Sequence, residues 1–337
     1  MFLEYGNSMS VQSRISISPA SSFFGRVRQT WQHGDWLYRA LLLLATMLVL
    51  SLVIAIGYEL WINSALSRQA FGWRFIITAD WDPALNETFG ALPFILGTLI
   101  TSVIALFVAI PLGLGTAVFL AELAPNWLRQ PLGFLVELLA AVPSVVYGLW
   151  GLFVYVPAFV RPLADGLNKN FGFLPLFTGP VFGPSRLAAG LLLAIMVFPT
   201  ITAVSRDVFL AIPNSQREAA LALGSTRWET IWQVLIPYGL SGLLGATILG
   251  LGRALGETVA ITMVIGNNLD LSASLLHPGY TMASIIANEF TEATYDLYVH
   301  ALIEIGLILF IMTLLINLIA RLLIWRLARR TSAEVRT

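Results

Sequence analysis

Two charged residues lie four positions apart next to a long apolar stretch. Arg253 and Glu257 occur in the segment GRALGETVAI, directly after the uncharged run 230–252. A guanidinium group presents a planar set of donors that can hold two oxygens of an oxyanion at once. A neighbouring carboxylate can hold that group in place and compete with the anion, so that the anion can leave. The pair predicts a path or gate for an anion.

The depth of this pair in the chain makes it costly. Arg253 follows Pro237 by sixteen residues, about 24 Å of helix in a hydrocarbon layer about 30 Å thick. An arginine at such a depth costs about 2.5–3.5 kcal/mol, so it must face protein or water and have a partner. Glu257 is the expected partner, although arginine before glutamate is not the order that favours an isolated helix. A neutralised pair that only holds two spans together remains the alternative.

The composition indicates which elements position the pair. Hydrophobic residues make up 57% of the chain and charged residues 11%, against about 45–50% and about 25% in soluble domains. An all-α polytopic membrane protein is predicted, with six stretches that approach or exceed the roughly 20 residues that cross a bilayer. These are Ala40–Tyr58, Thr88–Ala121, Leu138–Val160, Leu187–Ser205, Thr230–Gly252 and Val299–Ala320. In the second run, Pro93 and Pro111 offer places to bend.

The basic residues predict the orientation of these spans. With the N-terminus inside, thirteen of the nineteen basic residues fall in cytoplasmic segments, five in outer loops, and Arg253 within a span. Basic residues are enriched on the cytoplasmic side of membranes. Both termini are therefore expected in the cytoplasm. The acidic residues Glu122, Glu137 and Glu304, at or near membrane depth, are expected to form interhelical or interfacial hydrogen bonds.

One polar insert interrupts the apolar runs. Residues Ser215–Glu218 have the spacing of a capping box, and Pro213 just before them stops the preceding helix. Helix-forming Ala219 and Ala220 follow, and Gly224 supplies the left-handed conformation that ends a helix. A short capped helix over 215–224 is predicted.

A second short helix is predicted after Gly224. Residues Thr226–Glu229 form another capping-box pattern, and Pro237 is expected to end the helix. A hairpin lying in the membrane interface is one interpretation, since tryptophans favour that depth. The small alanines flanked by charges favour docking into a groove of another protein.

These motifs resemble those of a known family. Glu218-Ala219-Ala220, Gly224 and Ile236-Pro237 are spaced as in the cytoplasmic coupling loop of ABC importer permeases. The segments FGALPFILGTLITSVIALFVAIPLGLGTAVFLAE, PSVVYGLWG and GRALGETVAI are similar to the PstC-type permease subunit of bacterial phosphate importers. The resemblance implies a type I ABC importer permease fold in the bacterial inner membrane, without enzymatic activity of its own.

The resemblance also implies a domain organisation and site residues. In that family Arg253 and Glu257 correspond to residues implicated in phosphate transport, and Glu218, Ala219, Ala220 and Gly224 belong to the helix that docks on the ATPase. The expected segments are a flexible or interfacial cytoplasmic N-terminus 1–36, a first transmembrane helix 37–62, a periplasmic loop 63–91, a permease core 92–325 with the coupling loop 213–237, and a cytoplasmic tail 326–337.

Energy and further subunits must come from other chains. The only lysine, Lys169, stands between Asn168 and Asn170, so the Gly-Lys-Ser/Thr phosphate-binding loop of an ATPase is missing. No cofactor is expected in this chain, because ATP and magnesium would be bound by the partner. The family implies a PstA-type second permease, a PstB-type ATPase dimer and a PstS-type phosphate-binding protein, in contact with membrane lipid.

Several other functions have little support. The chain has no cysteine and only three scattered histidines, so no metal site is expected, and its net charge of zero gives no basis for nucleic-acid binding. An intramembrane enzyme would need a catalytic constellation that the spans lack. A permease for another oxyanion such as sulfate, or a secondary transporter that couples ions through Arg253 and Glu257, remains an alternative.

Overall fold

The computed structural model describes the backbone of residues 35–334 and the side chains of residues 36–326. The chain divides into two compact units, Met1–Tyr58 and Glu59–Thr337. The 29-residue helix α2 (Asp35–Asn63) makes up the described part of the first unit and ends within the second, and its large apolar side chains are exposed, as expected of a helix that faces lipid. The predicted N-terminal segment 1–36 lies almost entirely outside the described residues.

The second unit consists of helices joined by loops. Its first elements along the chain are α3 (Ala65–Phe71), α4 (Arg74–Ile77), α5 (Leu92–Val118), η1 (Phe119–Leu123), α6 (Asn126–Ala141), α7 (Ser144–Trp150), η2 (Gly151–Val160), α8 (Arg161–Phe171) and η3 (Pro175–Phe177). They are followed by α9 (Arg186–Ala211), α10 (Asn214–Ala222), α11 (Arg227–Thr230), η4 (Ile231–Leu235), α12 (Ile236–Gly256), α13 (Val259–Val264), α14 (Met282–Glu289) and α15 (Asp296–Glu334). Among the described residues, only two isolated bridges, Asp82–Thr88 and Gly266–Gly279, have β pairing.

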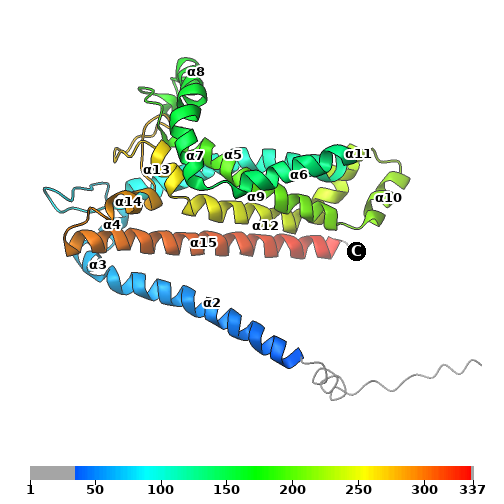
Figure 1. The fold of residues 1–337 in the computed structure, drawn as a ribbon, viewed down its shortest axis with the longest axis horizontal. Coiled ribbons are helices and arrows are strands. Elements are labelled where there is room, and N and C mark those ends of the chain that lie inside the picture. Colours follow the sequence, from blue (N-terminus) through cyan, green and yellow to red (C-terminus); the bar gives the residue numbers. More distant parts are fainter. Residues whose placement is uncertain (1–34, 335–337) are drawn as a thin grey trace, which may run out of the picture. The chain divides into compact units, whose positions relative to one another are not determined.

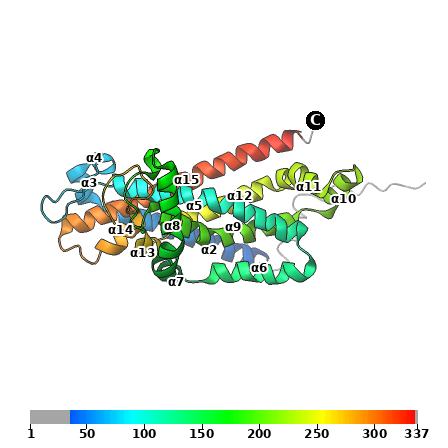
Figure 2. The same ribbon diagram turned by 90° about the horizontal axis from the view of Figure 1, so that it is seen from above.

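Within the described part of the chain, six helices are long and apolar enough to cross a membrane, which agrees with the predicted number. They are Trp36–Asn63, Leu92–Leu123, Ser144–Phe171, Arg186–Ala211, Arg227–Gly256 and Asp296–Arg326. In both views of the second unit, α5, α9, α12 and α15 run in one general direction, whereas the helix from α7 to α8 lies across it (Figures 1 and 2). Helices α10 and α11 lie at one end of this bundle, and α4 and α14 at the other.

Helix α9 is the centre of the bundle. Within its apolar window 67% of the residues are buried, the highest share of the six candidate spans. It packs against α5, α12 and α6. Glycines permit this close approach, because a Cβ at Gly113 or Gly250 would lie 2.9 Å from side-chain atoms of Ile201 in α9. Close backbone packing of this kind is how membrane helices gain dispersion energy when lipid is as apolar as the side chains.

The third span begins later than predicted. Helix α6 ends at Ala141, Val142 is extended, and α7 begins at Ser144. Pro143 is the reason, because its ring disfavours a helical conformation at the preceding residue. The predicted Leu138–Val160 span is therefore divided between α6 and the continuous helix Ser144–Phe171.

The prediction that Pro237 ends the second helix of the coupling loop is also wrong. Pro237 does not end a short helix but lies in the first turn of α12, and the helix Arg227–Gly256 is continuous. Just before it, Ile231–Leu235 form a π-helix. In a π turn the backbone hydrogen bonds join residues five apart instead of four. This change accommodates proline, which has no backbone N–H to donate. Residues 227–237 are thus the start of the fifth span.

An aromatic cluster lies at the end of the second unit that carries α4 and α14. Glu289 forms hydrogen bonds within it. Glu289 accepts hydrogen bonds from Trp81 Nε1 (2.7 Å) and the Tyr298 hydroxyl (2.6 Å), and Trp81 packs edge-on against Phe89 and Phe94. Arg186, buried at the start of α9, donates to the backbone carbonyls of Ser272 and Asp270. These bonds hold the loop before α14 against the core.

Two glycines of α5 provide a test of this packing. A Cβ at Gly97 would lie 1.8 Å from the carbonyl oxygen of Tyr280, whereas one at Gly115 would meet no atom within 4 Å. We expect Gly97→Ala to lower the free energy of unfolding by about 2 kcal/mol, because the backbone at Tyr280 must move. Gly115→Ala should be neutral or stabilising by up to about 1 kcal/mol. Thermal unfolding of the purified chain in detergent measures both, and equal effects would contradict the α5 packing described.

Candidate functional site

Arg253 lies in the last turn of α12 and is half-buried. Its Nη1 donates to the Thr200 hydroxyl of α9 (3.3 Å). A cation in the last turn of a helix is stabilised by the helix dipole. Thr200 is also half-buried, so the guanidinium lies at the boundary of the core and is not enclosed by it.

The position of Thr200 sets the depth of Arg253. Thr200 lies near the middle of α9, about 21 Å from its Arg186 end and about 16 Å from its Ala211 end at 1.5 Å per residue. If α9 spans the membrane, Arg253 lies near the middle of the hydrocarbon layer. Like the distance to Pro237, this places Arg253 inside the hydrocarbon layer, but nearer to its middle than that distance implies.

The predicted partnership between Arg253 and Glu257 is wrong in this structure. Helix α12 ends at Gly256, and Glu257 has an extended backbone with φ −69° and ψ 126°. A pair four residues apart meets only when both are helical. Glu257 instead accepts a hydrogen bond from the backbone N–H of Ala260 (3.3 Å), near the start of α13. Within the described residues, Arg253 forms no ion pair.

The predicted coupling helix exists with a shifted start. Helix α10 covers Asn214–Ala222 and begins directly after Pro213, so Ser215 is its second residue and forms no cap. The predicted Ser215–Glu218 capping box is therefore wrong, because the extended ψ of 138° at Pro213 lets the helix start one residue before Ser215. Gly224 has a φ of +89°, which confirms the predicted left-handed turn.

The second capping box is confirmed. The Thr226 hydroxyl accepts from the Glu229 N–H (3.3 Å), and Glu229 accepts from the Thr226 N–H (2.7 Å). Glu218 and Ala219 are exposed on α10, whereas Ala220 is buried against the rest of the chain. The exposed part of α10 is therefore free to contact another protein, while Ala220 fixes its opposite part.

An ion pair fastens α10 to two membrane helices. Arg217 Nη2 lies 2.6 Å from Glu122 Oε1 in η1, and the two side chains are 18% and 14% exposed. The guanidinium also donates to the carbonyls of Phe209 and Ile212 at the end of α9, each at 2.6 Å. We call these four residues the Arg217 junction. In the sequence, the only sign of this junction is that Arg217 directly precedes Glu218 of the coupling motif.

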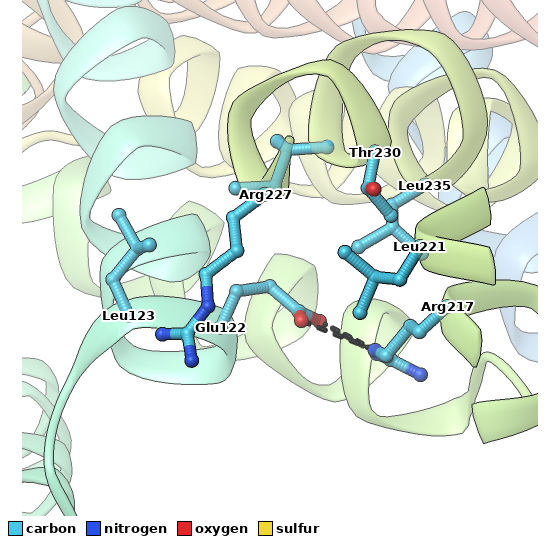
Figure 3. Close-up of a pocket in the computed structure, with 8 residues that line it drawn as sticks. Glu122, Leu123, Arg217, Leu221, Arg227, Thr230 and Leu235 are labelled. Atoms are coloured by element: carbon cyan, nitrogen blue, oxygen red, sulfur yellow. Dashed lines mark hydrogen bonds and ion pairs between the residues drawn. The ribbon is translucent and has the colours of Figure 1, made fainter. Parts of the chain in front are cut away.

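The Arg217 junction borders a cavity of about 100 Å³. Figure 3 shows Arg217 and Glu122 facing each other, with Leu221 of α10 beside them and Arg227 extending towards Leu123. A low-dielectric setting with saturated hydrogen bonding makes such a pair rigid. The Arg217 junction therefore connects α10 directly to η1 and to the end of α9.

The other acidic residues had different outcomes. Glu137 of α6 forms an ion pair with Arg206 of α9 at 3.1 Å, so the predicted interhelical bonding of Glu122 and Glu137 is confirmed. Glu304 is buried in α15, and its Oε2 has no hydrogen-bond partner in the described part of the chain. The prediction for Glu304 is therefore wrong.

Comparison with known proteins identifies the family. Residues 109–333 match the family described as binding-protein-dependent transport system inner membrane component. The chain is 45% identical over 301 residues to the phosphate transport system permease protein PstC of Xylella fastidiosa strain 9a5c, across 88% of this chain and 92% of that protein. It is 47% identical over 303 residues to the PstC of Haemophilus influenzae, across 89% and 95%. The chain belongs to the PstC-type permeases of this family. As a permease, it is a transport component and not an enzyme.

Solved structures support the fold of the permease. A chain of a bacterial ABC transporter involved in the import of the acidic polysaccharide alginate matches with a TM-score of 0.50 at 19% identity, across 89% of this permease and 99% of that chain. An inward-facing MetNI methionine ABC transporter matches with a TM-score of 0.50 at 18% identity, across 69% and 94%. The type I ABC importer permease fold is therefore shared, and the permease is a multi-pass membrane protein.

The Arg217 junction can be tested by stability. We expect Arg217→Gln to lower the free energy of unfolding by about 2–3 kcal/mol, because it leaves Glu122 partly buried without its counter-charge. The double variant with Glu122→Gln should recover part of this loss. Thermal unfolding of the purified permease in detergent measures each variant.

Arg227 provides the matched control for the junction. It lines the same cavity but has no ion pair within the part of the chain that the structure describes. Arg227→Gln should change the free energy of unfolding by less than about 0.5 kcal/mol. A loss equal to that of Arg217→Gln would mean that the pair contributes no specific stability.

Proposed function

We propose that this permease is one of two membrane subunits that form the pathway of an ATP-driven importer of inorganic phosphate in the bacterial inner membrane. Its relatives named phosphate transport system permease protein PstC are 45–47% identical over most of the chain. Thirteen of the nineteen basic residues fall in the segments that are cytoplasmic when both termini are inside, which supports that orientation.

The unpaired charge of Arg253 carries the phosphate proposal. An arginine near the middle of a hydrocarbon layer needs a counter-charge, and within residues 36–326 Arg253 has only the neutral Thr200 hydroxyl as a hydrogen-bond acceptor. Its remaining N–H groups can bind two oxygens of a phosphate ion side by side. The bound anion therefore supplies the negative counter-charge that the protein does not provide. Because Arg253 alone holds the anion, binding is weak enough for the anion to leave again.

Glu257 does not hold the Arg253 side chain in place but acts as a gate. It lies half-buried in the non-helical break between α12 and α13. Non-helical backbone at membrane depth is tolerated where it lines a cavity or is covered by protein. A carboxylate at this break repels an anion that moves beyond Arg253, so the break acts as a gate.

Helix α10 acts as the coupling helix. The exposed Glu218 and Ala219 contact the ATPase subunit, the buried Ala220 fixes the helix to the permease, and Gly224 permits the sharp turn into α11. Force on α10 passes through the Arg217 junction to the end of α9. Eleven residues further up the same helix, Thr200 holds Arg253. Closure of the ATPase pair is thereby transmitted to the anion site.

The remaining components come from other chains. We infer a PstA-type permease that completes the pathway, a PstB-type ATPase dimer that binds ATP and magnesium, and a PstS-type protein that delivers phosphate outside the membrane. The coarser requirement for a binding protein follows from the family to which the permease belongs. The three specific partners rest on the names of its relatives.

Uptake of labelled phosphate tests the role of Arg253. In cells that lack their own high-affinity importer and receive this permease with its partners, Arg253→Gln should reduce uptake at least about tenfold, since charge-assisted hydrogen bonds contribute about 1.5–3 kcal/mol. Arg253→Lys keeps the charge without the planar donors, so its uptake should be intermediate. Equal membrane assembly of the variants is checked first.

The same assay separates the alternative functions. Normal uptake by Arg253→Gln would make Arg253 a structural residue. Labelled sulfate, carried in place of phosphate by the wild type, would assign another oxyanion, because a guanidinium binds any tetrahedral oxyanion. Uptake that survives loss of ATP but stops with the proton gradient would indicate a secondary transporter.

Charge reversal on α10 tests coupling. Glu218→Arg should lower phosphate uptake and co-purification of the ATPase about tenfold, because it changes the docking surface. It should leave the thermal stability of the permease unchanged, because Glu218 is exposed. Gln216→Ala, also exposed on α10, is the control. Unchanged ATPase recovery with Glu218→Arg would place the docking contact elsewhere.

A further inference from the structure

A second polar site lies outside the anion pathway, between α3, α4 and α15. It is a cavity of about 310 Å³, lined by both aliphatic and aromatic side chains and by two groups of opposite charge. The residues that matter here are Trp61, Arg68, Trp73, Glu304, Leu307 and Ile311. Neither proposed transport residue nor the coupling helix contributes to it.

Glu304 is the unusual member of this cavity. Its side chain is 5% exposed, and its Oε2 is buried without a hydrogen-bond partner within the described residues. The Ser67 hydroxyl lies beside the carboxyl group, but the two form no hydrogen bond of normal geometry. An unpaired buried carboxylate costs several kcal/mol. Within membrane spans such a residue indicates a functional site whose partner must be identified.

Arg68 supplies the opposite charge at the same cavity. Its guanidinium lies 3.7 Å from the centre of the Trp61 ring, and its Nη2 donates to the Trp61 carbonyl at 2.6 Å. Its Nε donates to the Ser64 hydroxyl at 3.0 Å, which leaves Nη1 without a bond among the described groups. Arg68 forms no ion pair with Glu304. The two charges are therefore held apart in one cavity.

The surroundings match a membrane interface. Glu304 lies eight residues after the start of α15, about 12 Å along the helix. Trp61 and Trp73 are 53% and 85% exposed, and tryptophans are enriched at the level of lipid headgroups. Ile311, about two turns further along α15, is exposed and apolar, as required where acyl chains begin. On the orientation proposed above, this level belongs to the outer leaflet.

We propose that this cavity binds the headgroup of a phospholipid with a primary ammonium, of the phosphatidylethanolamine class. The ammonium donates to the unpartnered Glu304 oxygen, and Arg68 Nη1 donates to the phosphodiester. Leu307 and Ile311 contact the start of an acyl chain. Phosphatidylglycerol carries the same phosphodiester charge but has no ammonium to pair with Glu304. A quaternary ammonium cannot donate a hydrogen bond.

Native mass spectrometry of the detergent-purified permease with its membrane partner tests the site. Phosphatidylethanolamine, its mono- and dimethylated forms, phosphatidylcholine and phosphatidylglycerol of identical acyl chains are added in turn. The expected result is one retained phosphatidylethanolamine, at about tenfold lower lipid concentration than phosphatidylcholine, with retention falling at each methylation. Equal retention along the methylation series overturns the proposal without any variant.

Variants assign the effect to the cavity. Glu304→Gln should reduce phosphatidylethanolamine retention about tenfold and leave phosphatidylglycerol unchanged. Arg68→Gln should reduce both, because both lipids carry the phosphodiester. Glu292→Gln, which removes an exposed carboxylate that does not line the cavity, is the matched control. Full retention with Glu304→Gln, or preferred retention of phosphatidylglycerol by the wild type, overturns the proposal. If Glu304→Gln does not assemble, the Arg68 variant and the methylation series still decide it.

Discussion

A polar group at membrane depth has no water to bond, and this constraint explains most of the irregular features of the permease. At the two ends of α9, Arg186 donates to two loop carbonyls, although its buried Nε has no partner among the described groups, and Arg217 donates to a carboxylate and to the last carbonyls of α9. Proline satisfies the constraint in another way, since the π-helix before Pro237 rearranges the backbone hydrogen bonds so that the helix continues. For the two arginines the fold supplies partners from other elements, whereas at Pro237 the adjustment is local.

Arg253 and Glu304 are the exceptions, because each lacks a counter-charge, and this lack points to a ligand. Both lie in helices that belong to candidate spans, and neither has a partner of opposite charge among the described residues. A fully neutralised arginine would have little capacity for a substrate, because an anion would have to displace an internal carboxylate. A site for a charged ligand therefore has to be left partly unsatisfied by the protein. The unfavourable free energy of the unpaired charge is offset by favourable packing elsewhere, above all around α9.

Helix α9 connects three levels of the molecule. Its first residue, Arg186, holds the loop before α14, its middle carries Thr200 beside Arg253, and its last turn receives the bonds of Arg217. Its glycine-mediated contacts with α5 and α12 leave little space for independent movement. A buried, closely packed helix moves as a rigid body. This is the physical basis for transmitting a change at the coupling helix to the middle of the membrane.

Much of this protein follows from the order of residues alone. Twenty-residue apolar runs in water-free surroundings can only be helices, so six spans and the fold class were predictable, as were the Gly224 turn and the Thr226 capping box, which depend on neighbours in sequence. Motif order was sufficient to indicate the family. Local patterns also explain where prediction was wrong at Ser215 and at the third span, since the conformation after Pro213 and before Pro143 outweighed the capping and hydropathy signals.

Only the tertiary structure decided the partners of the charged residues. Four-residue spacing paired Arg253 with Glu257, but α12 ends between them, and Thr200, fifty-three positions away, takes that place. Glu122 and Arg217 are ninety-five positions apart and share no recognisable pattern. Side-chain pairing at membrane depth depends on which helices lie next to each other and where their backbones break. Both are set by the packing of the whole bundle and cannot be deduced from spacing along the chain.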